Sequence, residues 1–276
     1  MPKIVCLDID GTLLNEFGKI TETNRLAIER LKAEHHYVVI ASGRTYAEIV
    51  KIVAPLALME YDRAFFISYN GVLTVRTFPF TVLMKKLLHR EDVRMIAAEL
   101  LPRGFKLHVY AENKIYLSED IVQHLQISPE EKKPLVRIDM SDYDKSDDVY
   151  KVLLLDDADR LDGLKTTLPA AFADRFAVFK SWDRLLEFVH RDGSKGAALE
   201  NLYRTLRIPR EDVIAIGDEE NDISMILSAG IGIAMGNAKP AVKAVAPYLT
   251  LSNRFDGVAA AIDKYIFDKE SGKHGV

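Results

Sequence analysis

The sequence predicts an α/β protein: a parallel β-sheet core into which a second, α+β domain is inserted. Two observations support this fold class. Short apolar runs alternate with helical patterns near both ends of the chain, whereas the middle is denser in aromatic and charged residues. Alternation of strands and helices favours parallel strands with helices on both faces of the sheet. The 276 residues suffice for one large domain or for two unequal ones.

The first part of the chain begins this alternation. Residues 4–9, 37–42 and 64–69 are short apolar runs rich in β-branched and aromatic residues, which predicts three buried strands. Between the first two runs, residues 21–34 place apolar side chains at helical spacing, and Thr21 is a suitable N-cap. We therefore expect a strand, a helix and a strand in succession here.

The last part of the chain repeats the pattern. It predicts a helix at residues 195–207, a strand at 213–217, a helix at 222–230 and a strand at 230–236. These elements are expected to belong to the same parallel sheet as the first three strands.

The middle of the chain has a residue pattern that is typical of antiparallel strands. Residues 106–118 resemble a hairpin, and further strand-like runs with helices between them follow at residues 150–157, 175–180 and 185–190. We expect a discontinuous core domain formed by residues 1–82 and 189–276, with residues 83–188 as the inserted α+β domain.

Charge and composition limit the classes of partner. The formal net charge is −4 and no block of Lys or Arg stands out, which argues against nucleic acid and anionic membrane surfaces. A small phosphorylated molecule remains compatible, because a single pocket can be positive in an acidic protein. The only cysteine, Cys6, excludes a disulfide within the chain and a cysteine-rich metal site.

Targeting signals are not evident. The N-terminus lacks the charged start, apolar stretch and cleavage site of a signal peptide, and no apolar run is long enough to span a bilayer. We therefore expect a cytoplasmic protein, either a monomer or a homodimer.

Polar residues follow four of the predicted parallel strands at the point where each strand ends. They are Asp8 and Asp10, then Ser42, Gly43 and Arg44, then Asn70, and finally Asp218, Asn221 and Asp222. Lys195 opens the helix before the last of these strands. Open parallel sheets bind ligands beyond the carboxyl ends of their strands, so these residues are expected to form one site.

This set of residues suits Mg²⁺-assisted chemistry on a phosphate ester. Mg²⁺ binds oxygen ligands and keeps several waters, so two or three carboxylates plus a substrate phosphate suit it. A phosphoryl group in transfer is stabilised mainly by fixed cations and hydrogen-bond donors. A carboxylate can also attack phosphorus, so Asp8 could be a nucleophile. Asp10 could protonate the leaving oxygen and later activate water.

Each of these residues also has a simpler interpretation. Asp8 and Asp10 could be turn-formers, although polar residues at the other strand ends argue against this. Ser42 could cap the following helix, Lys195 could be a solvated helix residue, and Asp222 could only complement a helix dipole. If the strand geometry continues through Asp10, both N-terminal acids lie on the same side, because side chains alternate along a strand.

Four motifs, in order, resemble the signatures of the haloacid dehalogenase superfamily. They are DIDGTLL at 8–14, ASGR at 41–44, GSKGAAL at 193–199 and GDEENDISM at 217–225. SYNG after the third strand, the following insertion and the run GIGIAMGNA resemble the Cof-type subfamily with a type IIB cap. The resemblance covers nearly the whole chain, and it implies a Rossmann-like core with an inserted cap domain.

The resemblance also implies roles for the residues at the strand ends. Asp8 would be the nucleophile and a Mg²⁺ ligand, and Asp10 would be the general acid/base, with its backbone carbonyl on the metal. Asp218 would complete the protein's share of the metal site, and Asp222 would support it from behind. The phosphate would be held by Ser42, the amides of Ile9 and Gly43, Lys195 and Asn221. A substrate or supporting role is implied for Arg44 and Asn70.

The predicted function is that of a Mg²⁺-dependent phosphatase acting on a small phosphorylated metabolite, with sugar phosphates as the class that the family implies. Two alternatives stay open. One is a phosphomutase or phosphotransferase that passes the phosphoryl group to a sugar hydroxyl. The other is a non-enzymatic phosphate-accepting or binding protein, for which a general acid at Asp10 and a large inserted domain have no evident use.

Overall fold

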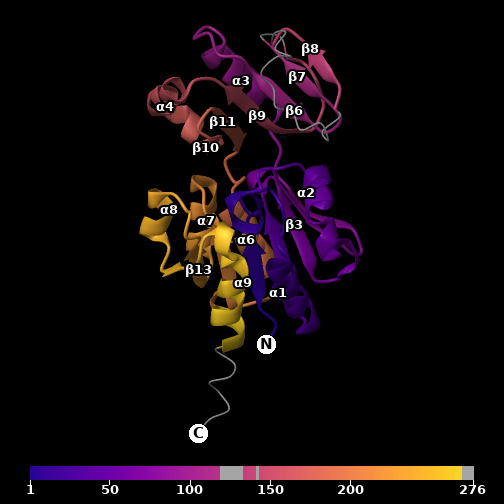
Figure 1. Cartoon of the computed structure of the whole chain (residues 1–276). Helices are drawn as coiled ribbons and strands as arrows, with labels where there is room; N and C mark the ends of the chain where they lie inside the picture. The colour runs from indigo at the N-terminus through magenta and orange to yellow at the C-terminus, as the bar shows by residue number, and fades with distance from the viewer. Residues whose placement is uncertain (119–132, 141–142, 269–276) are drawn as a thin grey trace. The chain divides into compact units, whose positions relative to one another are not determined.

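The computed structural model describes residues 1–118, 133–140 and 143–268, and it divides the chain into two units (Figure 1). The core unit contains Met1–Met84 and Ser194–Val276, and the inserted unit contains Lys85–Gly193. The core unit is therefore built from both ends of the chain. In the residues that the model describes, no helix has both the length and the apolar character needed to cross a membrane.

The core unit is built on an eight-stranded sheet with the order β14-β13-β12-β1-β2-β3-β4-β5. Its strands are β1 Ile4–Leu7, β2 Tyr37–Ala41, β3 Ala64–Ser68, β4 Leu73–Arg76, β5 Thr81–Lys85, β12 Val213–Gly217, β13 Ile231–Ala234 and β14 Tyr248–Leu249. Six neighbouring strands, from β14 to β3, pair in parallel. Because β1 lies between β12 and β2, the N-terminal strand is central in the sheet. The predicted α/β class is confirmed.

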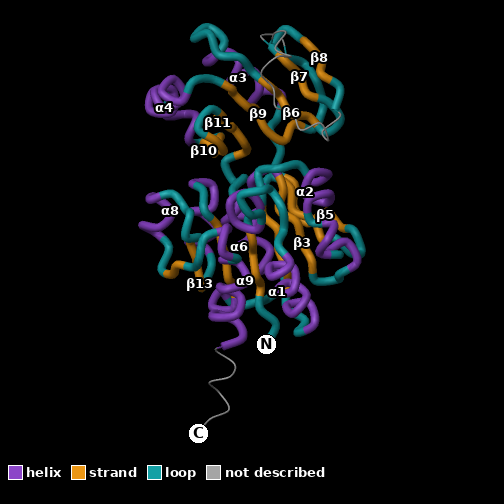
Figure 2. The backbone as a smooth tube through the Cα atoms, viewed as in Figure 1, coloured by secondary structure: helices purple, strands orange, loops and turns teal. Residues whose placement is uncertain are grey.

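Helices cover both faces of this sheet (Figure 2). They are α1 Glu22–Ala33, α2 Tyr46–Ile52, α6 Lys195–Thr205, α7 Ile223–Ser228, α8 Pro240–Val245 and α9 Gly257–Ile262. On one face, α6 and α7 pack against Cys6, Val39 and Ile67. On the other face lie α1, α2 and α9. As predicted, Thr21 caps α1, and its side chain accepts a hydrogen bond from the amide of Asn24.

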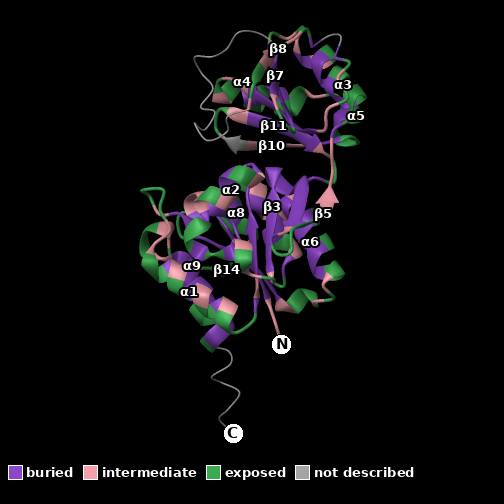
Figure 3. Cartoon of the chain, turned by 90° about the vertical axis from the view of Figure 1, so that its right-hand side faces the viewer, coloured by how far each residue is buried: buried purple, intermediate pink, exposed green. Residues whose placement is uncertain are grey.

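The central strands are buried on both faces, as Figure 3 shows by colour. Every residue of β1 is fully buried. This explains why β1 is a continuous apolar run and not an alternating one, since a strand covered by helices on both faces has no solvent side. The residues that follow such a strand are consequently held on a rigid support.

Three strands of the sheet were not predicted from the sequence: β4, β5 and, at the opposite edge of the sheet, β14, whose two residues are exposed. β4 pairs antiparallel with β3, and β5 forms the edge of the sheet beyond it. The first two residues of β5, Thr81 and Val82, are exposed. An edge strand of this kind is only partly buried, so it lacks the continuous apolar run by which the central strands are recognised.

The inserted unit contains a six-stranded sheet with the order β10-β11-β9-β6-β7-β8. Its strands are β6 His108–Ala111, β7 Ile115–Leu117, β8 Leu135–Arg137, β9 Val149–Leu155, β10 Phe176–Trp182 and β11 Leu185–His190. All described pairings are antiparallel except the one between β7 and β8. The predicted hairpin over residues 106–118 corresponds to β6 and β7.

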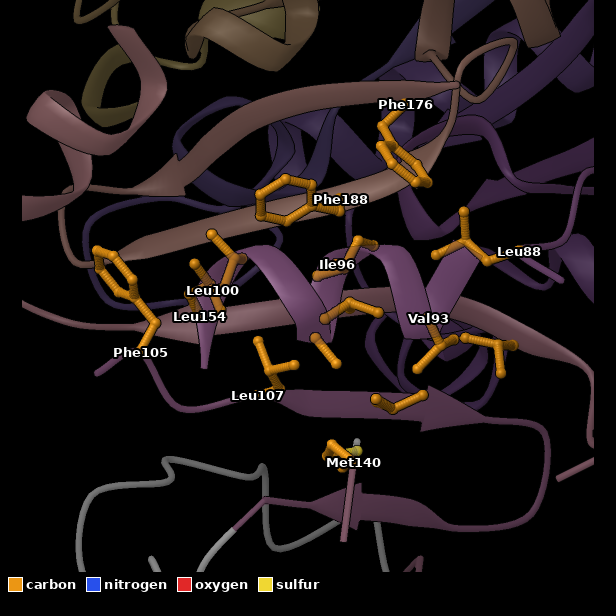
Figure 4. Close-up of a cluster of buried hydrophobic side chains, with 14 of the residues drawn as sticks. Leu88, Val93, Ile96, Leu100, Phe105, Leu107, Met140, Leu154, Phe176 and Phe188 are labelled. Atoms are coloured by element: carbon orange, nitrogen blue, oxygen red, sulfur yellow. The ribbon is translucent and has the colours of Figure 1, made fainter. Parts of the chain in front are cut away.

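One face of this second sheet carries the hydrophobic core of the inserted unit. Among its described residues, the α-helices of this unit are α3 Arg90–Leu100, α4 Ala158–Thr167 and α5 Ala170–Ala173. Figure 4 shows Val93 and Ile96 of α3 among side chains of the strands, including Leu154 and Phe188. The inserted unit thus has a core of its own, separate from the cluster beneath α6 and α7.

Candidate active site

The predicted site residues lie at one edge of the core sheet. Asp8 directly follows β1, Ser42 follows β2, and Asp218 follows β12. These three strands are adjacent and parallel, so their carboxyl ends meet at the same edge. Asn70 lies in the turn after β3, the next strand along the sheet. The topology thereby brings together loops that are far apart in the sequence.

A buried ion cluster joins Lys195 to two aspartates. The Lys195 Nζ donates to Asp8 Oδ1 over 2.6 Å and to Asp222 Oδ1 over 2.5 Å. The side chains of Lys195 and Asp222 are fully buried, and that of Asp8 is 8% exposed. A buried charge is tolerated only with close partners, so these three groups depend on one another. Lys195 is therefore not a solvated helix residue.

Asp222 holds the loop after β12 in place. Its Oδ2 accepts hydrogen bonds from the backbone amides of Asp218 and Glu219, over 2.9 and 3.0 Å. Because its Oδ1 faces Lys195, both oxygens of Asp222 already have donors. Its role thus extends beyond complementing a helix dipole, and its carboxylate orients Lys195 and Asp218 together.

Asp218 is held by the turn that follows Asp8. Its Oδ1 accepts a hydrogen bond of 2.6 Å from the hydroxyl of Thr12. Gly11 lies so close that a Cβ there would be 2.2 Å from Asp218 Oδ2, and its φ of +78° is left-handed. A glycine is therefore required at this position both by the backbone conformation and by the space that the carboxylate occupies.

Electrostatics in this cluster favour an added cation. Burial raises the pKa of Asp8 well above its usual value of 3.8, and Asp222 adds to this while Lys195 opposes it. Burial also raises the pKa of Asp218 to about 7, against the Thr12 hydrogen bond and with help from Asp222. Burial disfavours the charge on Lys195, but Asp222 and Asp8 outweigh it and raise the pKa of Lys195. Three acids thus share one cation, and the excess of negative charge is costly.

The donor set of this cluster fits a divalent metal ion. Asp8, Asp218 and Asp222 each offer a carboxylate oxygen, and these oxygens lie within 4.8 Å of one another. Oxygen ligands of this kind are those that Mg²⁺ prefers. Such an ion would offset the excess negative charge. The predicted grouping of acids at this edge of the sheet is therefore consistent with a metal site.

The loop after β2 carries Ser42 at the same edge of the sheet as the cluster. The Ser42 side chain is nearly buried, and its Oγ accepts a hydrogen bond from the amide of Arg44 over 3.2 Å. The N-cap of α2 is Thr45, whose side chain accepts from the amide of Glu48 in a capping box. Ser42 is thus not needed as the helix cap, and its hydroxyl proton remains available as a donor.

Asp10 has a different environment from Asp8. Arg44 forms a bidentate ion pair with it, in which Nε donates to Oδ2 and a terminal guanidinium nitrogen donates to Oδ1, each over 2.7 Å. The Asp10 side chain is 41% exposed. Asp8 and Asp10 were expected on the same side only if the strand geometry continued through Asp10. It does not continue, because β1 ends at Leu7 and Ile9 already has a helical backbone. Each acid consequently has its own cation, Lys195 for Asp8 and Arg44 for Asp10.

The amides of Asn70 and Asn221 contact each other. Asn221 Nδ2 donates to Asn70 Oδ1 over 2.9 Å, and Asn70 is buried. In the sequence these residues are 151 positions apart. The loop after β3 is therefore connected to the loop after β12 through side chains.

Two residues of the site were missed by sequence reasoning. Thr12 was not among the predicted site residues, although its hydroxyl donates a hydrogen bond to Asp218. Asn237, after β13, donates to the carbonyl of Gly11 over 2.8 Å and lies 3.5 Å from Asp218 Oδ2. Its position at the end of another parallel strand was the signal that could have identified it.

Known proteins resemble the whole chain. A family model described as haloacid dehalogenase-like hydrolase matches residues 5–262. The protein 5-amino-6-(5-phospho-D-ribitylamino)uracil phosphatase YcsE of Bacillus subtilis (strain 168) is 30% identical over 267 residues, which covers 96% of each chain. The similarity therefore extends over both units.

Solved structures share this architecture. A haloacid dehalogenase-like hydrolase from Bacteroides thetaiotaomicron is 32% identical, with a TM-score of 0.80 over 96% of this chain and 99% of that one. A sugar phosphatase of subclass IIB is 24% identical, with a TM-score of 0.79 over 95% of this chain and 98% of that one, which shows a common fold.

Proposed function

Because this chain belongs to the haloacid dehalogenase-like hydrolases, we propose that it is a Mg²⁺-dependent phosphatase that hydrolyses a small sugar phosphate through an aspartyl-phosphate on Asp8. The predicted superfamily and the predicted enzyme class, a phosphatase, are both confirmed by the family match and by relatives that are named phosphatases. The dependence on Mg²⁺, the covalent intermediate and the substrate class are the proposal.

The observation that carries this proposal is the contact of Lys195 with Asp8. Lys195 neutralises Oδ1 of a buried carboxylate and leaves Oδ2 without a described donor. An oxygen placed in this way is suited to attack phosphorus, since its partner oxygen is fixed and its orientation is set. The same ammonium group can stabilise the charge that develops on the phosphoryl oxygens.

The proposed reaction has two steps. In the first, Asp8 Oδ2 forms a bond to phosphorus while the bond to the leaving oxygen breaks, and Asp10 gives that oxygen its proton. In the second, Asp10 takes a proton from water, whose oxygen attacks phosphorus and displaces Asp8 to release inorganic phosphate. Asp10 thus begins as an acid and acts next as a base.

Asp8 and Asp218 are the proposed side-chain ligands of Mg²⁺, with the backbone carbonyl of Asp10 as a further ligand. Asp222 would support them, because both of its oxygens already accept from Lys195 and from two backbone amides. When bound, the ion supplies positive charge beside the phosphoryl oxygens and lowers the repulsion between substrate and carboxylates. Ser42, Lys195, Asn221 and the amides of Ile9 and Gly43 are the proposed phosphate-binding groups.

The substrate class rests on the names of relatives. YcsE acts on a phosphorylated ribityl compound by its name, and the subclass IIB neighbour is named a sugar phosphatase. Both names point to a phosphorylated polyhydroxylated carbon chain.

The proposed function is tested by steady-state phosphate release from a panel of phosphorylated metabolites. We expect sugar and sugar-alcohol phosphates to give the highest kcat/KM, and we expect EDTA to abolish release and Mg²⁺ to restore it. Transfer of phosphate to an acceptor sugar instead of to water would favour a phosphomutase or phosphotransferase. A stoichiometric labelling of the protein without turnover would favour a phosphate-accepting regulatory protein.

Metal binding should depend on pH in a defined direction. The folded-state pKa of Asp218 is raised from 3.8 to about 7, so its contribution to stability is fully present below about pH 4 and is lost as the pH rises through 7. We expect the melting temperature in EDTA to fall between pH 5 and pH 8, and Mg²⁺ to raise it by roughly 3 °C or more at pH 8 but little at pH 5. Differential scanning fluorimetry measures both effects.

The matched control for this experiment is Asp218→Asn, which removes the titrating group. In this variant, both the fall in melting temperature and the stabilisation by Mg²⁺ should be much smaller. Equal stabilisation of the wild type by Mg²⁺ at both pH values would contradict the assignment of Asp218 as a ligand.

Arg44 should matter more for turnover than for stability. Its ion pair with Asp10 is partly exposed, and such pairs contribute only about 0–1 kcal/mol to the free energy of unfolding. The two parallel hydrogen bonds nevertheless fix the carboxyl that transfers the proton. We expect Arg44→Met to lower kcat by roughly tenfold or more, with a smaller change in KM, as measured by steady-state kinetics.

Arg25 provides the matched control for Arg44. It forms an equally close bidentate pair with Glu22 on the exposed surface of α1. Arg25→Met should therefore leave kcat unchanged, and both variants should melt near the wild-type temperature. If the two substitutions have the same effect on kcat, Arg44 does not act on the reaction through Asp10.

A further inference from the structure

The turn between β3 and β4 contacts three loops of the site. Tyr69 and Asn70 both have left-handed backbone conformations, with φ of +50° and +58°, and Gly71 has a φ of +107°. Consecutive left-handed residues other than glycine are uncommon, because the Cβ atom crowds the backbone. A turn of this kind is retained only where the surrounding structure fixes it, so its contacts are informative.

The backbone of this turn holds the loop after β2. The amide of Tyr69 donates to the carbonyl of Arg44, and the amide of Asn70 donates to the carbonyl of Ser42, each over 3.0 Å. The Asn70 side chain lies against the same loop, because a Cβ on Gly43 would be 2.9 Å from Asn70 Nδ2. Asn70 therefore limits the positions that the loop can adopt.

The turn also meets the residue before Lys195. A Cβ on Gly71 would lie 2.2 Å from the carbonyl oxygen of Ser194, which is the N-cap of α6. The start of α6, which carries Lys195, thus packs directly on the turn. No larger side chain than hydrogen fits between them.

The third contact sets the orientation of an amide. Asn221 Nδ2 donates one of its two protons to Asn70 Oδ1. The other oxygen of this pair, Asn221 Oδ1, is buried and has no hydrogen-bond partner among the residues that the structure describes. A buried acceptor without a donor is unfavourable. The hydrogen bonds of Asn221 alone therefore do not explain why its amide has this orientation. The carbonyl of Asn70 therefore determines which end of the Asn221 amide is presented.

We propose that Asn70 is a positioning residue that fixes the Asn221 amide, through the contact of the two side chains, so that its second N–H donates to the phosphoryl group. This inference rests on the proposed function and replaces a direct role of Asn70 on the substrate. Asn70 acts on the phosphoryl group through Asn221, and it is held in place by its left-handed backbone and by its contacts with the Ser42–Arg44 loop.

A double-mutant cycle on phosphate binding tests this proposal. The probe is inorganic phosphate in Mg²⁺ buffer, with its Kd measured by calorimetry, so that no turnover is needed. Asn70→Gly keeps a left-handed backbone but removes the side chain. We expect Asn70→Gly and Asn221→Ala each to weaken phosphate binding roughly tenfold, and the double variant to be no weaker than either single one.

Asn70→Asp is the conservative variant, since it tolerates the left-handed backbone and retains the oxygen that accepts from Asn221. In the Asn70→Asp background, Asn221→Ala should again weaken binding roughly tenfold. If Asn70→Gly does not fold, the test rests on the Asn70→Asp background alone. A change of less than about twofold in the Kd for phosphate, when Asn221→Ala is added to Asn70→Asp, would then overturn the proposal.

Arg207→Gly is the control for the backbone effect, because Arg207 is an exposed left-handed residue after α6, remote from these loops in the chain. It should leave phosphate binding unchanged.

Effects that multiply in the double variant, to roughly 100-fold, would show that Asn70 and Asn221 act independently and would overturn the proposal. Wild-type protein that binds phosphate with this coupling but does not release it from esters would overturn the proposed function and leave this inference intact.

Discussion

Asp8→Asn is expected to abolish phosphate release, lowering kcat by roughly 10⁴-fold or more. An amide oxygen is a poor nucleophile towards phosphorus, and it is also a weaker ligand for Mg²⁺ than a carboxylate. The substitution is nearly isosteric, and its amide oxygen can still accept the hydrogen bond from Lys195. Steady-state phosphate release with the best substrate of the panel measures the loss.

The loss of activity should not be a loss of folding. Burial raises the pKa of Asp8, so the charged form is disfavoured in the metal-free protein and a neutral replacement is tolerated. We expect Asp8→Asn to melt within a few degrees of the wild type in EDTA. Asp62→Asn, at an exposed acid outside the site, is the matched control and should keep full activity. Metal-dependent turnover that survives in Asp8→Asn would exclude Asp8 as the nucleophile.

Lys195→Met is expected to impair both stability and activity. It removes the cation that lies between Asp8 and Asp222 and leaves two buried carboxyl groups without compensation. Breaking a buried ion pair from one side costs about 3–5 kcal/mol in the free energy of unfolding. At about 2–4 °C per kcal/mol for a chain of this size, the melting temperature should fall by roughly 10 °C.

The pH dependence distinguishes this effect from a simple packing defect. Acids without a cation can be neutralised by protonation, so Lys195→Met should lose less stability at pH 5 than at pH 8. Lys51→Met, at an exposed lysine of α2, is the control and should change stability by no more than about 0.5 kcal/mol. A destabilisation of Lys195→Met that is the same at both pH values would indicate lost packing in place of uncompensated charge.

The central strands could be predicted because burial on both faces produces an unambiguous pattern. β1, β2, β3, β12 and β13 are short apolar runs between turn residues, and each was predicted within a few residues of its observed bounds. β4, β5 and β14 escaped prediction. β5 and β14 form the two edges of the sheet and are exposed or partly buried, and β4 is a four-residue antiparallel strand that includes Thr74 and Arg76. Edge pairing depends on neighbours in space, which local patterns do not report.

The residues of the candidate site could be predicted only as a set of strand ends. Parallel pairing places those ends at one edge, so the proximity of Asp8 and Asp218 follows from topology. The partners of the individual side chains do not follow. That Arg44 binds Asp10, and that Asn70 binds Asn221, depends on turn conformations at Ile9 and Asn70 that alternation along a strand cannot predict.

The central position of β1 has a consequence for the order in which the protein can form. Asp8 is synthesised well before its cation, Lys195, which follows 187 positions later. The strand that flanks β1 on its other side, β12, emerges later still. An N-terminal fragment therefore lacks the charge that permits Asp8 to be buried, and closing such long loops makes late assembly slow. The ion cluster can therefore be completed only after the chain has been synthesised beyond Asp222.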